Sequence, residues 1–126
     1  MHQATDRRLI ERNGVKWPVT MLSPQGEVEG EIVNVSSKGA FISCNDIPPL
    51  EGSFRMVVKA PNFKSMFLGG KVIWSTVLKP QEGDPRLGIG VQFTSMSAGD
   101  RQSIQRAIAR HYREMSRRKT ASLKRR

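Results

Sequence analysis

The sequence has few of the residues on which catalysis, metal binding and cross-linking commonly depend. Its 126 residues include one cysteine, two histidines and one tyrosine. The lone Cys44 cannot form an intramolecular disulfide, and no Cys/His cluster has the spacing of a metal site. The sequence also has no glycine-rich phosphate loop and no recognisable pair of catalytic carboxylates. We therefore predict a protein that is not an enzyme and that needs neither a metal nor another cofactor.

Long apolar runs are missing as well. No apolar stretch approaches the roughly 18 residues that a membrane-spanning helix needs. The opening segment, residues 1–8, lacks the apolar stretch of a secretory signal. Together with the single cysteine, this composition favours a cytoplasmic protein without a membrane span.

Positive charge is plentiful, but it is concentrated at one end of the chain. The formal net charge is +10. Residues 101–126 hold ten Lys and Arg and one acidic residue, a net charge of +9, which leaves a net charge of +1 for residues 1–100. A nucleic-acid-binding domain is expected to carry positive charge over its folded face. The distribution therefore disfavours nucleic acid as the partner.

Six segments alternate apolar and polar residues with the period of β-strands. They begin near Val15, Val28, Ala40, Phe54, Met66 and Arg86. The alternation places Trp17 and Trp74 on inward faces, and Pro18 predicts that the first strand is an edge strand or carries a bulge. Cys44 falls on an inward face too, which indicates a small buried side chain.

The apolar period changes to that of a helix after Thr94. Ser97 and Asp100 have the spacing of a capping box. An apolar stripe follows, formed by Ile104, Ala107, Ile108, Tyr112 and Met115. The pattern predicts a mostly β fold, a small six-stranded antiparallel β-barrel with a C-terminal α-helix. We divide the chain into a flexible arginine-containing segment (1–14), the barrel with its helix (15–117) and a basic disordered tail (118–126).

Two short segments carry residues that the barrel pattern does not require. Arg8 and Arg12 lie four residues apart before the first strand, directly after Arg7. The second segment, Asn34-Val35-Ser36-Ser37-Lys38-Gly39, separates the second strand from the third. Each segment alone is common, but their order and spacing resemble the two-part signature of the PilZ domain family, Arg-x-x-x-Arg followed by Asp/Asn-x-Ser-x-x-Gly. The later strands and the terminal helix also resemble this family, over residues 7–115 in all.

The resemblance implies a bacterial second-messenger receptor that binds cyclic di-GMP and then regulates an unidentified protein partner. The implied ligand-binding residues are Arg7, Arg8, Arg12, Asn34, Ser36 and Gly39. An arginine fork can bind guanine O6 and N7 together, pair with a phosphate or stack on a base. A glycine allows a positive φ or close backbone approach. In this family an arginine directly before the first motif arginine is associated with a stacked ligand pair, so Arg7 implies two ligands per chain.

Two alternatives remain open. The basic end of the chain could make a small β-barrel that binds nucleic acid, although such barrels usually stack bases on exposed aromatic residues. A PilZ-type fold could also act as a protein-interaction module that has lost its ligand. The intact five-residue signature argues against this second alternative.

Overall fold

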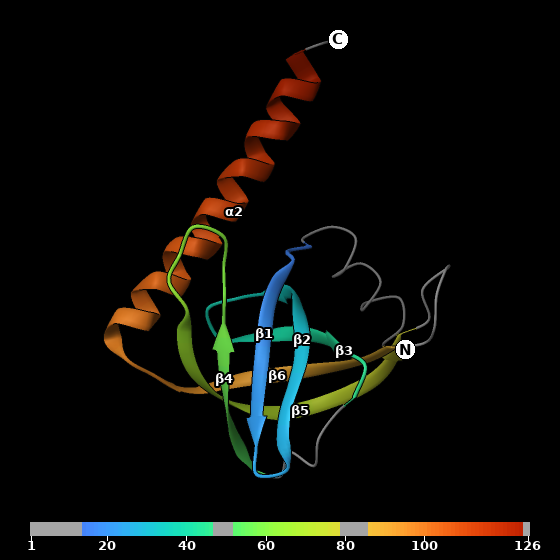
Figure 1. Cartoon of the computed structure of the whole chain (residues 1–126). Coiled ribbons are helices and arrows are strands. Elements are labelled where there is room, and N and C mark those ends of the chain that lie inside the picture. Colours follow the sequence, from blue (N-terminus) through green and yellow to red (C-terminus); the bar gives the residue numbers. More distant parts are fainter. Residues whose placement is uncertain (1–13, 47–51, 79–85, 125–126) are drawn as a thin grey trace.

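The computed structural model describes residues 14–46, 52–78 and 86–124, which form one barrel and one long helix (Figure 1). The elements are β1 (Trp17–Ser23), β2 (Gly26–Val35), β3 (Gly39–Cys44), β4 (Ser53–Val58), β5 (Met66–Leu78), β6 (Arg86–Met96) and α2 (Ala98–Lys124). All neighbouring strands are antiparallel, and the barrel closes in the order β1-β2-β3-β6-β5-β4. The predicted fold class is confirmed.

The barrel interior holds the apolar residues that the alternation placed inward. Fully buried side chains include Met21, Ile32, Ile42, Met56, Leu68 and Ile89. Trp17 and Cys44 also belong to this core, as predicted. Burial raises the pKa of the Cys44 thiol above its usual range. The thiol therefore stays protonated near neutral pH, which makes it a poor nucleophile.

The prediction of an edge strand or a bulge at Pro18 is wrong. In the closed barrel β1 pairs with β2 on one side and with β4 on the other, and Pro18 lies opposite Glu31. The Pro18 carbonyl accepts a hydrogen bond from Lys59 N–H at 3.0 Å, just after the end of β4. Because the N–H and C=O of a strand residue point the same way, the N–H that proline lacks would face this end of the ladder. The missing N–H of Pro18 therefore interrupts no hydrogen bond in the middle of the β1–β4 ladder.

A bulge in β5 overturns the predicted inward position of Trp74. Val72 pairs with Val91, whereas Trp74 pairs with Gly90, so Ile73 is an extra residue in the ladder. One inserted residue shifts every later side chain to the opposite face of the sheet. Trp74 consequently lies on the outer face of the barrel, while Val72 packs against the core.

The helix α2 begins where the capping pattern predicts. The Ser97 hydroxyl accepts a hydrogen bond from Asp100 N–H at 3.0 Å. Asp100 Oδ2 in turn accepts one from Phe67 N–H at 3.2 Å, which ties the first turn to β5. Ile104 and Ala107 are buried against the barrel. The first half of α2 is thus fixed to the barrel at two places.

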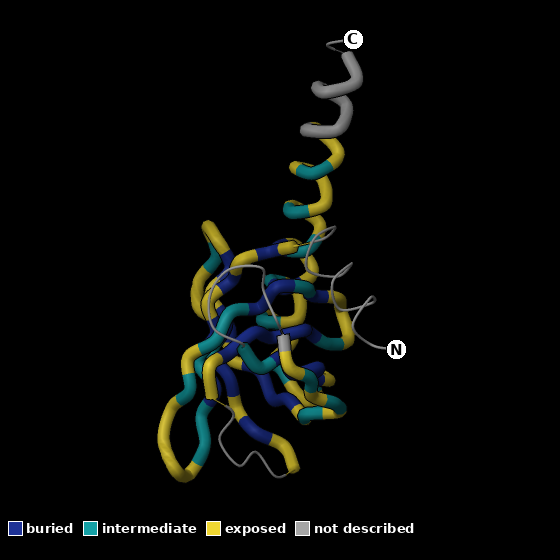
Figure 2. Tube along the Cα trace, turned by 90° about the vertical axis from the view of Figure 1, so that its right-hand side faces the viewer, coloured by how far each residue is buried: buried dark blue, intermediate teal, exposed yellow. Residues whose placement is uncertain are grey.

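The helix ends later than predicted. It continues to Lys124, although a disordered tail was expected from residue 118 onward. Residues 118–124 contain no glycine or proline and consist largely of good helix formers, so the helix propagates without an apolar stripe. Figure 1 shows the first half of α2 alongside the barrel and the second half standing clear of it. Figure 2 shows the buried residues gathered in the barrel and mostly exposed or intermediate residues along the described part of α2. Within the residues described, no helix has the length and apolar character needed to span a bilayer.

Candidate functional site

Four strands each place one residue in a row across the outer face of the barrel. Asn34 of β2 pairs with Phe41 of β3, Phe41 pairs with Gly90 of β6, and Gly90 pairs with Trp74 of β5. Directly opposed residues of antiparallel strands point to the same face. The two neighbours of Phe41 in β3 belong to the core. Phe41 and the other three residues therefore face outward.

Gly90 allows two aromatic side chains to stack across a strand. A Cβ at Gly90 would collide with ring atoms of Trp74, so the indole lies directly over the glycine backbone. The Phe41 and Trp74 rings are stacked, with 5.2 Å between their centroids and an interplanar angle of 17°. Phe41 is only 4% exposed although it lies outside the core cluster. The partly exposed indole of Trp74 therefore lies on the outer surface with the buried Phe41 ring stacked against it, and we call this pair the aromatic platform.

An open groove with a volume of about 560 Å³ lies over the aromatic platform. Besides the platform and Gly90, its lining includes Asn34, Ser36, Lys38, Gly39, Ile73 and Gln92. Its volume lies within the range of about 300–1,000 Å³ that is usual for small-molecule sites. Polar and basic side chains thus surround an aromatic floor.

The turn between β2 and β3 is held by its own hydrogen bonds. Ser36 N–H donates to Gly39 O at 2.8 Å, and the Ser36 hydroxyl accepts from Lys38 N–H at 3.2 Å. The Lys38 carbonyl accepts a hydrogen bond from Phe93 N–H at 2.9 Å, which joins the turn to β6. The side chain of Ser36 therefore shapes the turn, a common role of serine.

Gly39 is required by the close approach of β3 to β6. A Cβ at this position would collide with the main-chain carbonyl oxygen of Val91. Its φ is not positive, unlike that of Gly26 and Gly52. Of the two roles that the sequence allows for this glycine, the structure shows close backbone approach. Gly39 therefore positions the turn at the edge of the groove.

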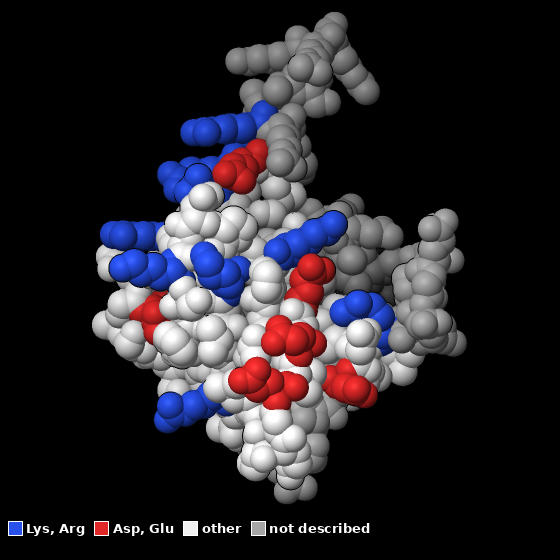
Figure 3. Space-filling model, viewed as in Figure 1, with Lys and Arg blue, Asp and Glu red and all other residues white. Residues whose placement is uncertain are grey.

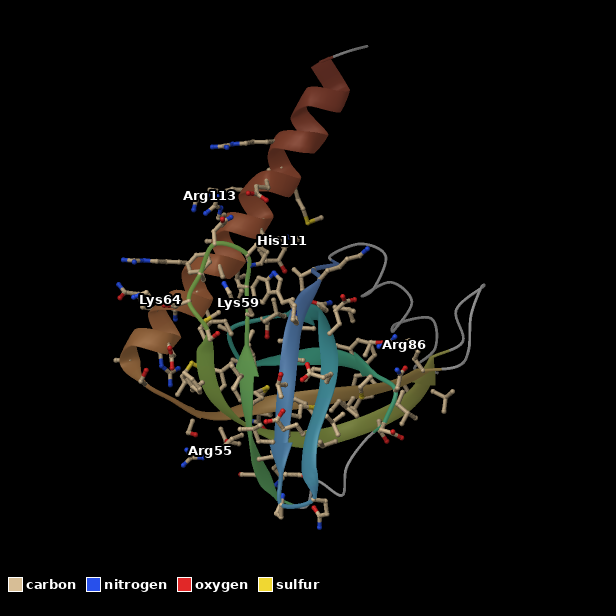
Figure 4. All side chains as sticks on the ribbon, in the orientation of Figure 1. Arg55, Lys59, Lys64, Arg86, His111 and Arg113 are labelled. Carbon is tan, nitrogen blue, oxygen red and sulfur yellow. The ribbon has the colours of Figure 1, made fainter. Side chains whose placement is uncertain are left out.

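Three basic side chains, one from the β2–β3 turn and one each from β5 and β6, lie on the same face as the groove. Lys38 is exposed in the β2–β3 turn, and Lys71 is exposed opposite Gln92. Further along the sheet, Arg86 Nε donates a hydrogen bond to the hydroxyl of Ser43 at 2.8 Å (Figure 4). Positive charge on this face favours an anionic ligand.

The structure brings together only part of the predicted site. Asn34, Ser36 and Gly39 line one groove. Arg7, Arg8 and Arg12 lie outside the described residues. In the described ranges, no group of three His, Cys, Asp or Glu side chains could hold a metal ion.

Sequence reasoning missed the aromatic platform. The bulge at Ile73 reverses the side on which Trp74 lies, and the alternation alone gives no sign of an extra residue. One available signal was Gly90, because a glycine inside a strand often marks the close approach of another group. A second signal was Phe41, a large apolar residue between two inward-facing positions.

Comparisons with known proteins agree with this fold. The sequence profile of the PilZ domain matches residues 6–110. The PilZ domain of YcgR from Escherichia coli, solved with c-di-GMP, superposes with a TM-score of 0.68 at 16% identity over 83% of this chain and 87% of that chain. MrkH, described as a c-di-GMP-dependent transcription regulatory factor, superposes with a TM-score of 0.60 at 14% identity over 79% of this chain and 45% of that chain.

At these identities the structural matches show a shared fold. No curated protein sequence matches this chain. The profile match covers most of the chain, including both parts of the arginine and asparagine-serine-glycine signature. The chain therefore belongs to the PilZ domain family, whose members are generally receptors for cyclic di-GMP and not enzymes.

Proposed function

We propose that this PilZ domain is a bacterial receptor that binds cyclic di-GMP in the groove over the aromatic platform. One observation carries the proposal. Asn34, Ser36 and Gly39, the second part of the signature, line a groove whose floor is the stacked pair of Phe41 and Trp74. The E. coli YcgR domain with the same fold was solved with c-di-GMP, which supports the choice of ligand.

The chemistry of the groove suits a guanine nucleotide. A base stacked on an aromatic side chain gains about 1–3 kcal/mol. The amides of Asn34 and Gln92 can donate to and accept from base edges. Lys38 and Lys71 lie beside the groove and can offset phosphate charge. The aromatic floor thus suits the face of a base, the amide side chains suit its edge, and the lysines suit the phosphates of the ligand.

The arginine segment joins the barrel next to the groove. Val15 N–H donates a hydrogen bond to Val33 O at 3.1 Å, and Val33 directly precedes Asn34. Arg12 lies three residues before Val15, and Arg8 lies seven before it. An extended chain of about 3.3–3.6 Å per residue spans about 10 Å and 25 Å over these separations. Both guanidiniums are therefore within reach of a ligand on the platform.

Ligand binding would also change the surface that the receptor presents to a protein partner. When Arg7, Arg8 and Arg12 contact the ligand, the segment that carries them is held against the barrel. A protein partner then meets a surface of different shape and charge. The shift toward this state is limited by the difference in ligand affinity between the two states.

Replacing Trp74 by alanine is expected to weaken cyclic di-GMP binding by about 1–3 kcal/mol, roughly 5- to 150-fold, because one base loses its stacking surface. The fold should persist, since Trp74 lies outside the barrel core. The control is Phe67→Ala, which removes another outer-face aromatic of β5 that is 64% exposed. Fluorescence titration with a labelled ligand measures both variants. Equal affinities of Trp74→Ala and Phe67→Ala would show that the platform is not part of the site.

Calorimetric titration of the purified protein tests the receptor assignment and the number of ligands together. We expect binding of cyclic di-GMP at micromolar or lower concentration, much weaker binding of GMP and GTP, and two ligands per chain at saturation. A third guanidinium can offset the charge of a ligand pair and stack on its outer base. Arg7→Leu should therefore lower the stoichiometry toward one.

The outcomes of this titration are distinct. A wild-type stoichiometry of one at saturating ligand would refute the ligand pair and leave the receptor assignment intact. An absence of measurable binding would refute the receptor assignment. It would favour a PilZ-fold interaction module without a ligand.

A further inference from the structure

Four arginines of α2 recur at the spacing of one helix face. Arg106, Arg110, Arg113 and Arg117 follow one another at intervals of four, three and four residues, and all four are exposed. With about 3.6 residues per turn, these intervals keep the side chains within a narrow arc. The row extends about 16 Å at a rise of 1.5 Å per residue. We call these four residues the arginine stripe.

The arginine stripe lies to one side of the helix face that packs on the barrel. Ile104 and Ala107 are the buried residues of α2 and mark its barrel-facing side. At about 100° per residue, the centre of the stripe lies about 120° around the helix from these two residues. Arg110 also lines the small cavity between α2 and the barrel and pairs with Glu114 at 3.5 Å, with its side chain half exposed. Arg106, Arg113 and Arg117 are exposed and do not line that cavity, so a partner that approaches from outside can contact them.

The outer half of α2 gives such a partner access. Glu114 is the last helix residue that lines the small cavity between α2, Trp17 and the loop 60–63. The helix extends ten residues beyond Glu114, to Lys124, which is about 15 Å. In Figure 1 this part stands clear of the barrel. The helical segment therefore extends beyond the part of α2 that borders the barrel.

Acidic residues gather on a different surface. Glu27, Glu29 and Glu31 alternate along β2 and share its outer face. Figure 3 shows these red side chains over β1 and β2, and blue side chains both along the helix and on other parts of the barrel. Within the stripe, Arg110 pairs with Glu114 at 3.5 Å, but both side chains are about half exposed, so the pair contributes little. The acidic strip of β2 is thus separate from the arginine stripe, and a polyanion would be repelled by the first and attracted by the second.

Although the overall charge distribution disfavours nucleic acid, the exposed row of arginines on one helix face points the other way. We propose that the arginine stripe binds the phosphate backbone of duplex DNA without reading its sequence. Arginine pairs with phosphate through two parallel hydrogen bonds. Over about 16 Å, one strand of DNA offers roughly five phosphates, a density that four arginines match. A helix about 10–12 Å across also fits a major groove about 12 Å wide.

Two other occupants fit the stripe less well. A second copy of the chain could place its β2 glutamates against the stripe, but exposed ion pairs contribute only about 0–1 kcal/mol each. Release of counterions from DNA gives each phosphate contact a larger gain at low salt. A membrane surface would need an apolar face beside the arginines, and the buried apolar residues of α2 are used by the barrel.

The experiment is a fluorescence anisotropy titration of a labelled DNA duplex of arbitrary sequence with the full chain. Four phosphate contacts predict a loss of affinity on the order of 100-fold between about 50 and 200 mM salt. The stripe variant R106Q/R110Q/R113Q/R117Q keeps good helix formers at all four positions. In this variant the plot of log K against log salt should become less steep, with the magnitude of its negative slope reduced by up to about 3.6.

A matched control separates the stripe from net charge. K16Q/R55Q/K64Q/R101Q also removes four positive charges from exposed positions, but none lies on the stripe. Its DNA affinity and salt slope should stay close to those of the wild type. Arg106, Arg110, Arg113 and Arg117 do not line the groove, so unchanged cyclic di-GMP binding shows that the stripe variant is folded.

Four results would overturn the proposal. The first is an absence of DNA binding by the wild type, and the second is an equal loss in both four-residue variants. The third is a wild-type dimer in gel filtration that becomes monomeric in the stripe variant, which would assign the stripe to a second copy. The fourth is an affinity for an RNA duplex that exceeds the affinity for DNA by more than about tenfold, a difference of about 1.4 kcal/mol in binding free energy.

Discussion

Arg8→Ala and Arg12→Ala are each expected to weaken cyclic di-GMP binding by about 1–3 kcal/mol, roughly 5- to 150-fold, as for the loss of a bidentate guanine contact. Replacement by lysine should rescue only part of the loss, because an ammonium group cannot form the planar two-pronged contact. Calorimetric titration of the variants measures both effects. Arg55→Ala removes an exposed arginine of β4 and is the control.

The result that contradicts this prediction is wild-type affinity in both single variants. In that case the first part of the signature would not contribute to the site. The groove would then have to hold its ligand through Asn34, Lys38 and the aromatic platform alone. A loss confined to Arg12→Ala would instead limit the contact to the arginine that is closer to β1.

Gly39→Ala is expected to destabilise the fold by on the order of 3 kcal/mol, at the upper end of what overpacking costs. The added methyl group would collide with the carbonyl oxygen of Val91, which is part of the main chain and cannot swing aside. For a domain of this size the midpoint of thermal unfolding should fall by roughly 10 °C. Unfolding followed by circular dichroism measures the change.

The matched control is Gly99→Ala, in the first turn of α2. A Cβ there meets only the Ser97 hydroxyl oxygen, at 3.9 Å, so stability should be unchanged or slightly higher. Wild-type stability of Gly39→Ala would show that β3 and β6 do not approach as closely as described. If the prediction holds, weaker ligand binding in Gly39→Ala reports a displaced turn and not a lost ligand contact.

Much of the barrel could be predicted because its strands obey a local rule. The alternation of Leu87, Ile89 and Val91 in β6 identifies a half-buried strand without knowledge of its neighbours. The start of α2 was predictable for the same reason, since the hydroxyl of Ser97 and the backbone of Asp100 lie within one turn. Local patterns fix which segments are strands and where the helix begins.

The errors arise where structure depends on distant partners. The outward position of Trp74 depends on how β5 aligns with β6, and the alternation within β5 does not reveal the extra Ile73. The consequence of Pro18 depends on where β4 ends. The end of α2 was misplaced because helix propensity alone extends it where no apolar stripe requires it.

The candidate site divides in the same way. The turn of Asn34, Ser36 and Gly39 was found from a contiguous motif. The aromatic platform joins Phe41 to Trp74 across Gly90, so it requires the register of three strands at once. No pattern within a single segment contains that information.

The central claim is that cyclic di-GMP binds over the aromatic platform, and the two tryptophans of the chain offer the most direct test. Each indole N–H gives its own signal in the amide region of a nitrogen-labelled protein's NMR spectrum, and Trp74→Phe assigns the two. Trp74 lines the groove, whereas Trp17 is buried beside α2. We predict that saturating ligand shifts the Trp74 signal strongly and the Trp17 signal much less. If the Trp74 signal stays in place, or if only the Trp17 signal moves, the ligand does not bind over the platform.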